Sequence, residues 1–253
     1  DLTAWLSSDF QRGLMVPRPG RQLPNNRNLF LNNELVTDIT IPDSIKKIND
    51  CAFYGCSSIR SVVIPGSVTN IGNSAFAGCS SLTSVVIGNG VTSIGYRSFG
   101  SCTSLTSITI SDSVTSIGED SFKGCPIEKA TASALAIHYI PGAVLREAII
   151  TNGDIRNKEF YGYSSLTSVV MGNEVTSIGE SAFYGCKNLT NVTMGNGITS
   201  IGKSAFYNCN NLKSVIISEN VASIGESAFS GCYRLVEVIN KSKLTINVGK
   251  NNN

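Results

Sequence analysis

The sequence predicts a repeat solenoid, mainly β in secondary structure, with a parallel sheet along one face. Three observations predict this fold: a 23-residue internal period, a short alternating strand motif in each period, and glycine-containing turns between the motifs. The composition agrees with it. A chain of 253 residues that is 42% hydrophobic, 15% charged and contains 24 glycines suits an ordered protein with many turns, and it does not suit a disordered one.

Phenylalanine marks the internal period. Two runs of four residues recur at a step of 23: Phe53, Phe76, Phe99 and Phe122, then Phe160, Phe183, Phe206 and Phe229. Around each Phe, apolar or small residues recur in register, while the positions between them vary among Ser, Thr, Asn, Lys and Glu. One complete unit reads Ile71-Gly72-x-x-Ala75-Phe76-x-Gly78-Cys79-x-x-Leu82-x-x-Val85-x-Ile87-x-x-x-Val91. This regularity predicts stacked copies of one structural unit.

Each unit contains one expected strand and one expected helical turn. The piece Leu82-x-x-Val85-x-Ile87 alternates apolar and polar residues and is rich in β-branched side chains, which predicts a short strand with one buried face. Turn-forming residues follow it, as in Gly88-Asn89-Gly90. The Ser-Ala-Phe-x-Gly-Cys stretch is too short for a stable helix, and we expect one helical turn there. A single unit cannot bury enough surface to stand alone, so the units must stack.

Tracking the strand motif along the chain gives ten expected rungs. The first buried positions of the successive motifs are Val36, Ile59, Leu82, Leu105, Ile127, Leu145, Leu166, Leu189, Leu212 and Leu235. The step is 23 residues except across Leu105 to Leu166, where it is 22, 18 and 21. Two rungs with smaller side chains are therefore expected at Ile127-x-x-Ala130-x-Ala132 and Leu145-x-x-Ala148-x-Ile150. We expect a shortened helical turn, capped by Ser133, between them.

The expected organisation is a degenerate N-terminal repeat or cap over residues 1–34, followed by one continuous solenoid over residues 35–253. Within the solenoid, residues 126–165 form irregular, shortened coils. The register fades after Val238, and no polar cap over the last coil follows it. We therefore expect the natural chain to continue beyond residue 253.

The order Ile-Gly-x-x-Ala-Phe-x-x-Cys-x-x-Leu-x-x-Val-x-Ile resembles the repeat of the BspA-like leucine-rich-repeat proteins. The match covers roughly Leu29 to Ile239. The resemblance implies a leucine-rich-repeat solenoid in a bacterial protein that is secreted or displayed on the cell surface. Some members of the family are adhesins for host matrix proteins or for other cells. A shared scaffold does not fix the partner, because function depends on sites built onto the fold.

The cysteines also follow the period. Two columns are present, Cys56, Cys79, Cys102 and Cys125 in the first, and Cys186, Cys209 and Cys232 in the second. Neighbours in a column would stack about 5 Å apart, a distance that permits a disulfide. Parallel stacking points the side chains the same way, which is poor geometry for that bond. We expect buried free thiols that pack as small hydrophobes, and an occasional disulfide stays open as the alternative.

No catalytic, cofactor or metal site is predicted. His138 is the only histidine, so a Ser-His-Asp or Cys-His site would have to use it, and no Gly-x-Ser-x-Gly-like element accompanies it. The cysteines lack the Cys-x-x-Cys spacing of zinc sites, and no phosphate-binding loop occurs. A net charge of +2 gives no general attraction to nucleic acid. No apolar stretch reaches the ~20 residues of a membrane span.

The outward strand positions are the expected binding surface. They form a small, weakly polar and nearly uncharged stripe: Ser61, Val63, Ser84, Val86, Ser107, Thr109, Ser168, Val170, Asn191, Thr193, Ser214 and Ile216. We expect an adhesion or recognition protein that binds a protein or glycoprotein partner through many shallow contacts along this stripe. Two alternatives stay open. The stripe is only a set of good strand formers on a solvated sheet, or the protein is a structural spacer that presents another domain away from the cell.

Overall fold

The structure is a computed structural model, and it describes residues 28–31 and 33–245. The chain divides into two compact units. Unit 1 comprises Asp1–Ile127 and Tyr139–Pro141, and unit 2 comprises Glu128–His138 and Gly142–Asn253. The division falls inside the irregular stretch that the rung spacing identifies. The expected N-terminal cap over residues 1–34 lies mostly outside the described residues.

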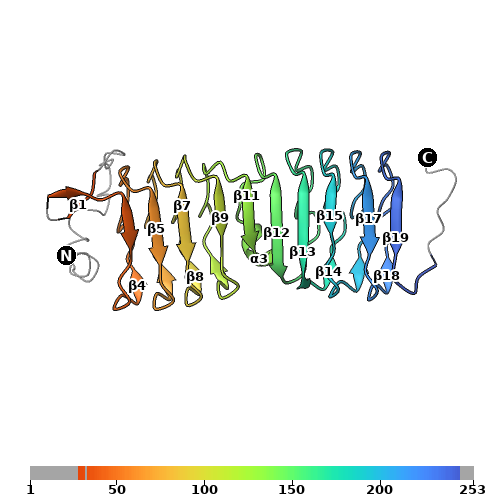
Figure 1. The fold of residues 1–253 in the computed structure, drawn as a ribbon, viewed down its shortest axis with the longest axis horizontal. Coiled ribbons are helices and arrows are strands. Elements are labelled where there is room, and N and C mark those ends of the chain that lie inside the picture. The colour runs from red at the N-terminus through yellow and green to blue at the C-terminus, as the bar shows by residue number, and fades with distance from the viewer. Residues whose placement is uncertain (1–27, 32, 246–253) are drawn as a thin grey trace. The chain divides into compact units, whose positions relative to one another are not determined.

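Unit 1 contains two parallel sheets, and each coil of the chain contributes one strand to each. The main-sheet strands are β3 (Asp38–Thr40), β5 (Ser61–Ile64), β7 (Ser84–Ile87) and β9 (Ser107–Thr109). The second sheet contains β4 (Lys47–Ile48), β6 (Asn70–Ile71), β8 (Ser93–Ile94) and β10 (Ser116–Ile117). Equivalent residues pair across neighbouring coils, as Val62 does with Val85. An antiparallel hairpin of β1 (Phe30–Leu31) and β2 (Glu34–Leu35) precedes the sheets (Figure 1).

Unit 2 repeats the same plan. Its main-sheet strands are β11 (Lys129–Ala132), β12 (Glu147–Asn152), β13 (Ser168–Glu174) and β15 (Asn191–Thr193). A further parallel pair is formed by β17 (Ser214–Ile217) and β19 (Glu237–Asn240). The second sheet contains β14 (Ser177–Ile178), β16 (Ser200–Ile201) and β18 (Ser223–Ile224). The pairing of β12 with β13 shifts register between Ile150 and Asn152.

The ten rung strands begin where the motif predicts. Each starts two residues after the first buried position of its motif: β3 at Asp38 follows Val36, and β11 at Lys129 follows Ile127. The two rungs with small side chains pair in register, Ala130 with Ala148. The predicted leucine-rich-repeat solenoid with parallel strands is confirmed.

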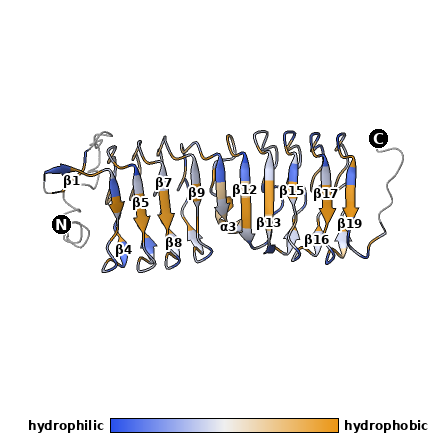
Figure 2. Ribbon diagram, viewed as in Figure 1, coloured by the Kyte–Doolittle hydropathy of each residue, from blue (hydrophilic) through white to orange (hydrophobic). Residues whose placement is uncertain are grey.

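The core of each coil is built from side chains that stack on the same residue of the next coil. In unit 1 the rings of Phe53, Phe76, Phe99 and Phe122 stack at centroid separations of 5.0, 5.3 and 5.5 Å. In unit 2 the rings of Phe160, Phe183, Phe206 and Phe229 do so at 4.9, 5.0 and 5.2 Å. Burial alternates along the strands as the pleat requires: in β7, Val85 and Ile87 are buried and Val86 is exposed. In Figure 2, strands such as β5, β7 and β17 show the orange that marks hydrophobic residues.

The segment that follows each second-sheet strand differs from the prediction. From Gly72 to Cys79 the chain forms consecutive hydrogen-bonded turns instead of a helical turn, and the equivalent segments of the other 23-residue coils do the same. Ser74 has φ 51° and Gly78 has φ 75°, values that a right-handed helix cannot contain. The amides bond to the next coil instead, as Phe76 N does to Ser98 O at 2.7 Å. The predicted helical turn is wrong here, and we call the surface formed by these segments the turn face.

The helical turn expected after Ser133 is confirmed. Helix α3 spans Ala134–Ile137 in the shortened coil of unit 2. The Ser133 hydroxyl accepts a hydrogen bond from Ala136 N at 3.2 Å, which satisfies an amide that has no partner within the helix. Ala134, Ala136 and Ile137 are buried, so the small side chains of this coil allow the helix to pack against the strands.

Candidate functional site

In unit 1 the predicted stripe forms an exposed, in-register row on the main sheet. We call the side chains at the first and third positions of each main-sheet strand the outer face. Val63 is 38% exposed and Val86 is 53% exposed, and they pair with each other across β5 and β7. Val86 pairs in turn with the exposed Thr109. Their serine partners in the same strands, Ser61, Ser84 and Ser107, are half-buried or exposed.

In unit 2 four of the six remaining predicted residues pair with one another in register. Ser168 pairs with Asn191 and Val170 pairs with Thr193, across β13 and β15. Ser214 is exposed, and Ile216 is 44% exposed on β17. The parallel strands thus bring together residues that lie 23 apart in the sequence, as the rung spacing predicts. Whether they bind a partner stays a prediction.

The outer face contains residues that the sequence reasoning omitted. They belong to β3, β11, β12 and β19, whose rungs the motif locates. Ile149 is 43% exposed and Ile239 is 41% exposed, both at the third strand position. Lys129 and Glu147 occupy first positions, and Lys129 Nζ lies 3.0 Å from Glu147 Oε1. The sequence could have identified these residues, because they lie two and four residues after the first buried position of each rung.

The outer face combines aliphatic side chains with hydroxyl groups and few charges. At its edge in unit 1, the Asp38 carboxylate accepts a hydrogen bond from the Ser61 hydroxyl. Hydrogen bonds from Ser61 and then Thr37 lower the pKa of Asp38 below its ordinary value. Such a face offers apolar contact and hydroxyl hydrogen bonds to a partner.

The cysteine columns are buried, and none of their cysteines forms a disulfide. Seven of the eight cysteines are buried, and Cys232 is half-buried. Six thiols donate to a phenylalanine carbonyl of the preceding coil at 3.0–3.2 Å, as Cys79 Sγ does to Phe53 O. Burial raises the pKa of the Cys186 thiol to about 12, which keeps it protonated and unreactive at neutral pH. The thiols therefore satisfy backbone carbonyls inside the core, a role that the sequence did not reveal.

The single histidine has a partner that the sequence reasoning missed. His138 Nδ1 lies 2.9 Å from Glu159 Oε1. The Glu159 side chain is 3% exposed, whereas that of His138 is 51% exposed. Glu159 occupies the position just before the phenylalanine, which is Ala or Ser in the other coils: Ala52, Ala75, Ser98, Ser121, Ala182, Ala205 and Ala228. Burying a carboxyl group is unfavourable without a hydrogen-bond partner, and His138 supplies one.

Across residues 28–31 and 33–245, no three or more His, Cys, Asp or Glu side chains gather in a way that could hold a metal ion. No helix in the same part of the chain is long and apolar enough to cross a membrane.

Comparison with known protein families gives one match. The model of the BspA type leucine rich repeat region, in six copies, matches residues 26–144 and 153–251. The resemblance drawn from the repeat order is therefore confirmed. No protein with a curated description matches the chain.

Several solved structures are similar to the chain. A leucine-rich repeat protein from Bacteroides ovatus is 24% identical, with 84% of this chain and 69% of that chain covered and a TM-score of 0.46. A leucine rich repeat protein from T. pallidum is 27% identical, with 78% and 77% covered and a TM-score of 0.40. A leucine rich cell surface protein from Faecalibacterium prausnitzii is 23% identical, with 83% and 80% covered and a TM-score of 0.32.

Proposed function

The chain belongs to the BspA-type leucine-rich-repeat family, and from this premise we propose that it is a secreted or cell-surface binding protein. It recognises a protein or glycoprotein on a host or neighbouring cell through the outer face. The family is compatible with a surface or binding role. The mechanism is shallow contact repeated along a rigid frame, with no chemical step.

One observation carries this proposal: exposed aliphatic side chains recur in register on the outer face. Val63, Val86, Ile149 and Ile216 are 38–53% exposed at the same strand position. A single exposed valine is ordinary, but paired exposed aliphatic side chains such as Val63 and Val86 form an apolar patch that another molecule can cover. Strand pairing holds the row rigid, so binding costs little conformational entropy.

The neighbouring serines set the kind of contact. Ser84 and Ser107 lie beside the aliphatic row and present hydroxyl groups that both donate and accept hydrogen bonds. Buried hot spots of binding interfaces are enriched in Trp, Tyr and Arg, none of which stands at the predicted positions. Affinity must therefore come from many modest contacts, and removing any one side chain should matter less than adding a charge.

The test is a matched pair of charge insertions in one coil. Ser107→Glu places a carboxylate on the outer face at the start of β9, and Ser116→Glu places one on the second sheet at the start of β10. Both serines are exposed first residues of short strands, so the substitutions perturb the fold equally. Binding is measured by surface plasmon resonance on immobilised fibronectin, fibrinogen, collagen and mucin.

Binding to at least one of these ligands is expected, and Ser107→Glu should weaken it about tenfold or more because the carboxylate must be desolvated on docking. Ser116→Glu should leave the affinity within about twofold. Equal binding by both variants would place the partner elsewhere and overturn the role of the outer face. Absence of binding to all four ligands contradicts the adhesion proposal and favours the spacer.

A further inference from the structure

The turn face of unit 1 contains a groove with a volume of about 680 Å³. It follows one repeat position, the residue after the buried phenylalanine, through four successive coils. That position holds Tyr54, Ala77, Gly100 and Lys123. All four residues line the groove, with Tyr54 in the first of these coils, the small Ala77 and Gly100 in the middle two and Lys123 in the last. The volume lies within the ~300–1,000 Å³ of small-ligand sites.

Unit 2 shows that side chains, and not the backbone, create this groove. Its turn face has the same hydrogen bonds between coils, Gly162 N to Tyr184 O at 2.8 Å where unit 1 has Gly55 N to Ala77 O at 2.8 Å. The same repeat position in unit 2 holds Tyr161, Tyr184 and Tyr207. Their rings stack at 4.9 Å with interplanar angles of 7° and 11°. Tyrosine thus fills in unit 2 the space that Ala77 and Gly100 leave open in unit 1.

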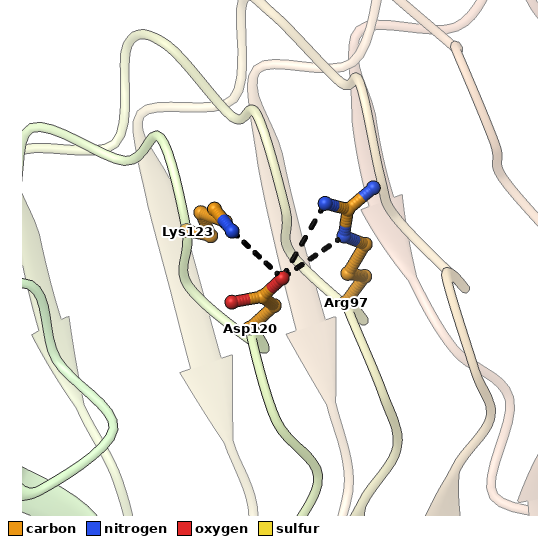
Figure 3. A network of polar contacts seen from close by, with 3 residues as sticks. All are labelled: Arg97, Asp120 and Lys123. Atoms are coloured by element: carbon orange, nitrogen blue, oxygen red, sulfur yellow. Dashed lines mark hydrogen bonds and ion pairs between the residues drawn. The ribbon is translucent and has the colours of Figure 1, made fainter.

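The charged side chains that line the groove are both cationic. Arg97 and Lys123 converge on the Asp120 carboxylate, which lies between them (Figure 3). Asp120 Oδ2 is 3.3 Å from Arg97 Nη2 and 3.0 Å from Lys123 Nζ. One carboxylate between two cations leaves one positive charge. The side chains of Arg97 and Lys123 are 47% and 63% exposed, so these pairs are weak and can be exchanged for a ligand anion.

Aromatic and hydroxyl groups complete the lining. Tyr96 is 46% exposed, and the Arg97 guanidinium lies 5.5 Å from the centre of its ring, which helps to fix the cation at the groove. Tyr54 offers a second ring. Four hydroxyl groups are spread along the groove: Ser74, Ser80, Ser101 and Thr103. The tyrosine rings can stack on the C–H faces of a sugar, and the serine and threonine hydroxyls can form hydrogen bonds with its hydroxyl groups. The cations suit a sugar that carries an acid group.

The backbone disfavours a peptide in the same place. A peptide that docks in an extended form gains most of its affinity from main-chain hydrogen bonds. The amides along this groove are already used between coils: Gly55 N donates to Ala77 O, Gly78 N to Gly100 O, and Ser101 N to Lys123 O. Recognition must therefore rely on side chains, which a sugar can satisfy and a peptide backbone cannot.

We propose that the groove between Tyr54 and Lys123 binds a short acidic oligosaccharide, with its sugar rings over Ala77 and Gly100 and its anionic group held by Arg97 and Lys123. The anionic group is a carboxylate or a sulfate, both of which accept hydrogen bonds from the N–H groups of the planar arginine guanidinium. This site lies on the turn face and is separate from the outer face of the main sheet. It adds a glycan-binding activity to the function proposed above.

The two groove variants take residues that the repeat already carries at the same positions, so the fold tolerates them. Ala77→Tyr copies unit 2 and fills the groove with a ring that stacks on Tyr54. Arg97→Ser with Lys123→Ser copies Ser74 and Ser230, and removes the charge while leaving the groove open. Lys203→Ser is the control, because it removes an exposed cation from the turn face of unit 2. Circular dichroism checks that each variant is folded.

Binding of tetragalacturonic acid, a sulfated chondroitin tetrasaccharide, neutral maltotetraose and tetra-aspartate is measured by isothermal titration calorimetry. The protein should bind at least one of the two acidic saccharides, and which one binds identifies the anionic group. Ala77→Tyr and the double serine variant should each weaken that binding by about tenfold or more, whereas Lys203→Ser leaves it unchanged. The proposal is overturned if neither acidic saccharide binds, if maltotetraose or tetra-aspartate binds as tightly, or if Ala77→Tyr has no effect.

Discussion

The turn faces of the two units share a backbone and differ in their side chains. The buried positions are the same in both: a stacked phenylalanine column, a cysteine column and amides that bond to the next coil. The residue after each phenylalanine differs, being Tyr, Ala, Gly and Lys in unit 1 but Tyr, Tyr, Tyr and Ser in unit 2. The repeat therefore constrains what lies inside each coil and leaves the position after the phenylalanine free to change. New surfaces can arise there without loss of the fold.

The largest effect should come from the shared interior. Phe76 and Phe183 are completely buried, and each lies between two stacked phenylalanine rings. Replacement of either by Ala should lower the free energy of unfolding by about 3–5 kcal/mol, because it removes a large buried side chain and leaves a cavity. Urea denaturation followed by circular dichroism measures this. A large cost in one unit and a negligible one in the other would show that the two columns are not equivalent.

The cysteine column makes a prediction about alkaline pH. The pKa of Cys186 is raised by burial from its ordinary value of 9.0 to about 12. Above pH 9 the unfolded chain releases a proton that the folded chain retains. The contribution of this thiol to the free energy of unfolding is therefore fully present below pH 9. It falls by roughly 1.4 kcal/mol per pH unit as the pH rises toward 12. Cys186→Ala should make the decline between pH 9 and 11 less steep, in urea denaturation at each pH. An unchanged slope would mean that the thiol is accessible to water in the fold.

The sequence predicts the strands well because their positions depend on a pattern that every coil repeats. The ten motifs place all ten rung strands, including the two small rungs at Ala130 and Ala148. The turn face could not be predicted in the same way. Ser74 and Ser181 adopt positive φ in the structure, and serine carries no sequence signal for that conformation. The hydrogen bonds that hold these turns join different coils, so no local propensity reports them.

The candidate binding surfaces show a similar division. The outer face follows from strand alternation, and its omitted members, such as Ile149, needed only the same rule applied to every rung. The partner of His138 was harder to find, because residues 138 and 159 are 21 apart in a coil that breaks the 23-residue step. One signal did exist: Glu159 lies 23 residues before Ala182, at a position that is Ala or Ser in the other coils. The groove could not be foreseen, since it depends on which side chains are missing from the turn face.

The shortened coil offers a third way to test the comparison, with an intermediate effect. His138→Ala leaves the Glu159 carboxyl group in the interior without its hydrogen-bond partner at 2.9 Å, and should cost about 2 kcal/mol of stability. Glu159→Ala restores the residue of most other coils and should cost less than His138→Ala, because no polar group stays buried. Thermal unfolding of the two single variants and the double variant at pH 7 measures this order. If Glu159→Ala proved the more damaging, the carboxyl group would have a role beyond its pairing with His138.

The smallest effect should come from exchanging the residue after the phenylalanine between the units. Tyr184 stacks on both Tyr161 and Tyr207 at 4.9 Å, so Tyr184→Ala should cost about 1 kcal/mol. The reciprocal change, Ala77→Tyr, adds a ring beside Tyr54 and should leave the stability of unit 1 unchanged or raise it by about 0.5 kcal/mol. Urea denaturation of both variants measures the pair. A loss of more than about 1 kcal/mol in Ala77→Tyr would show that the turn face of unit 1 cannot accept the tyrosine ladder. The groove would then reflect a difference in backbone, and the small residues that line it would be needed for folding as well as for the open space.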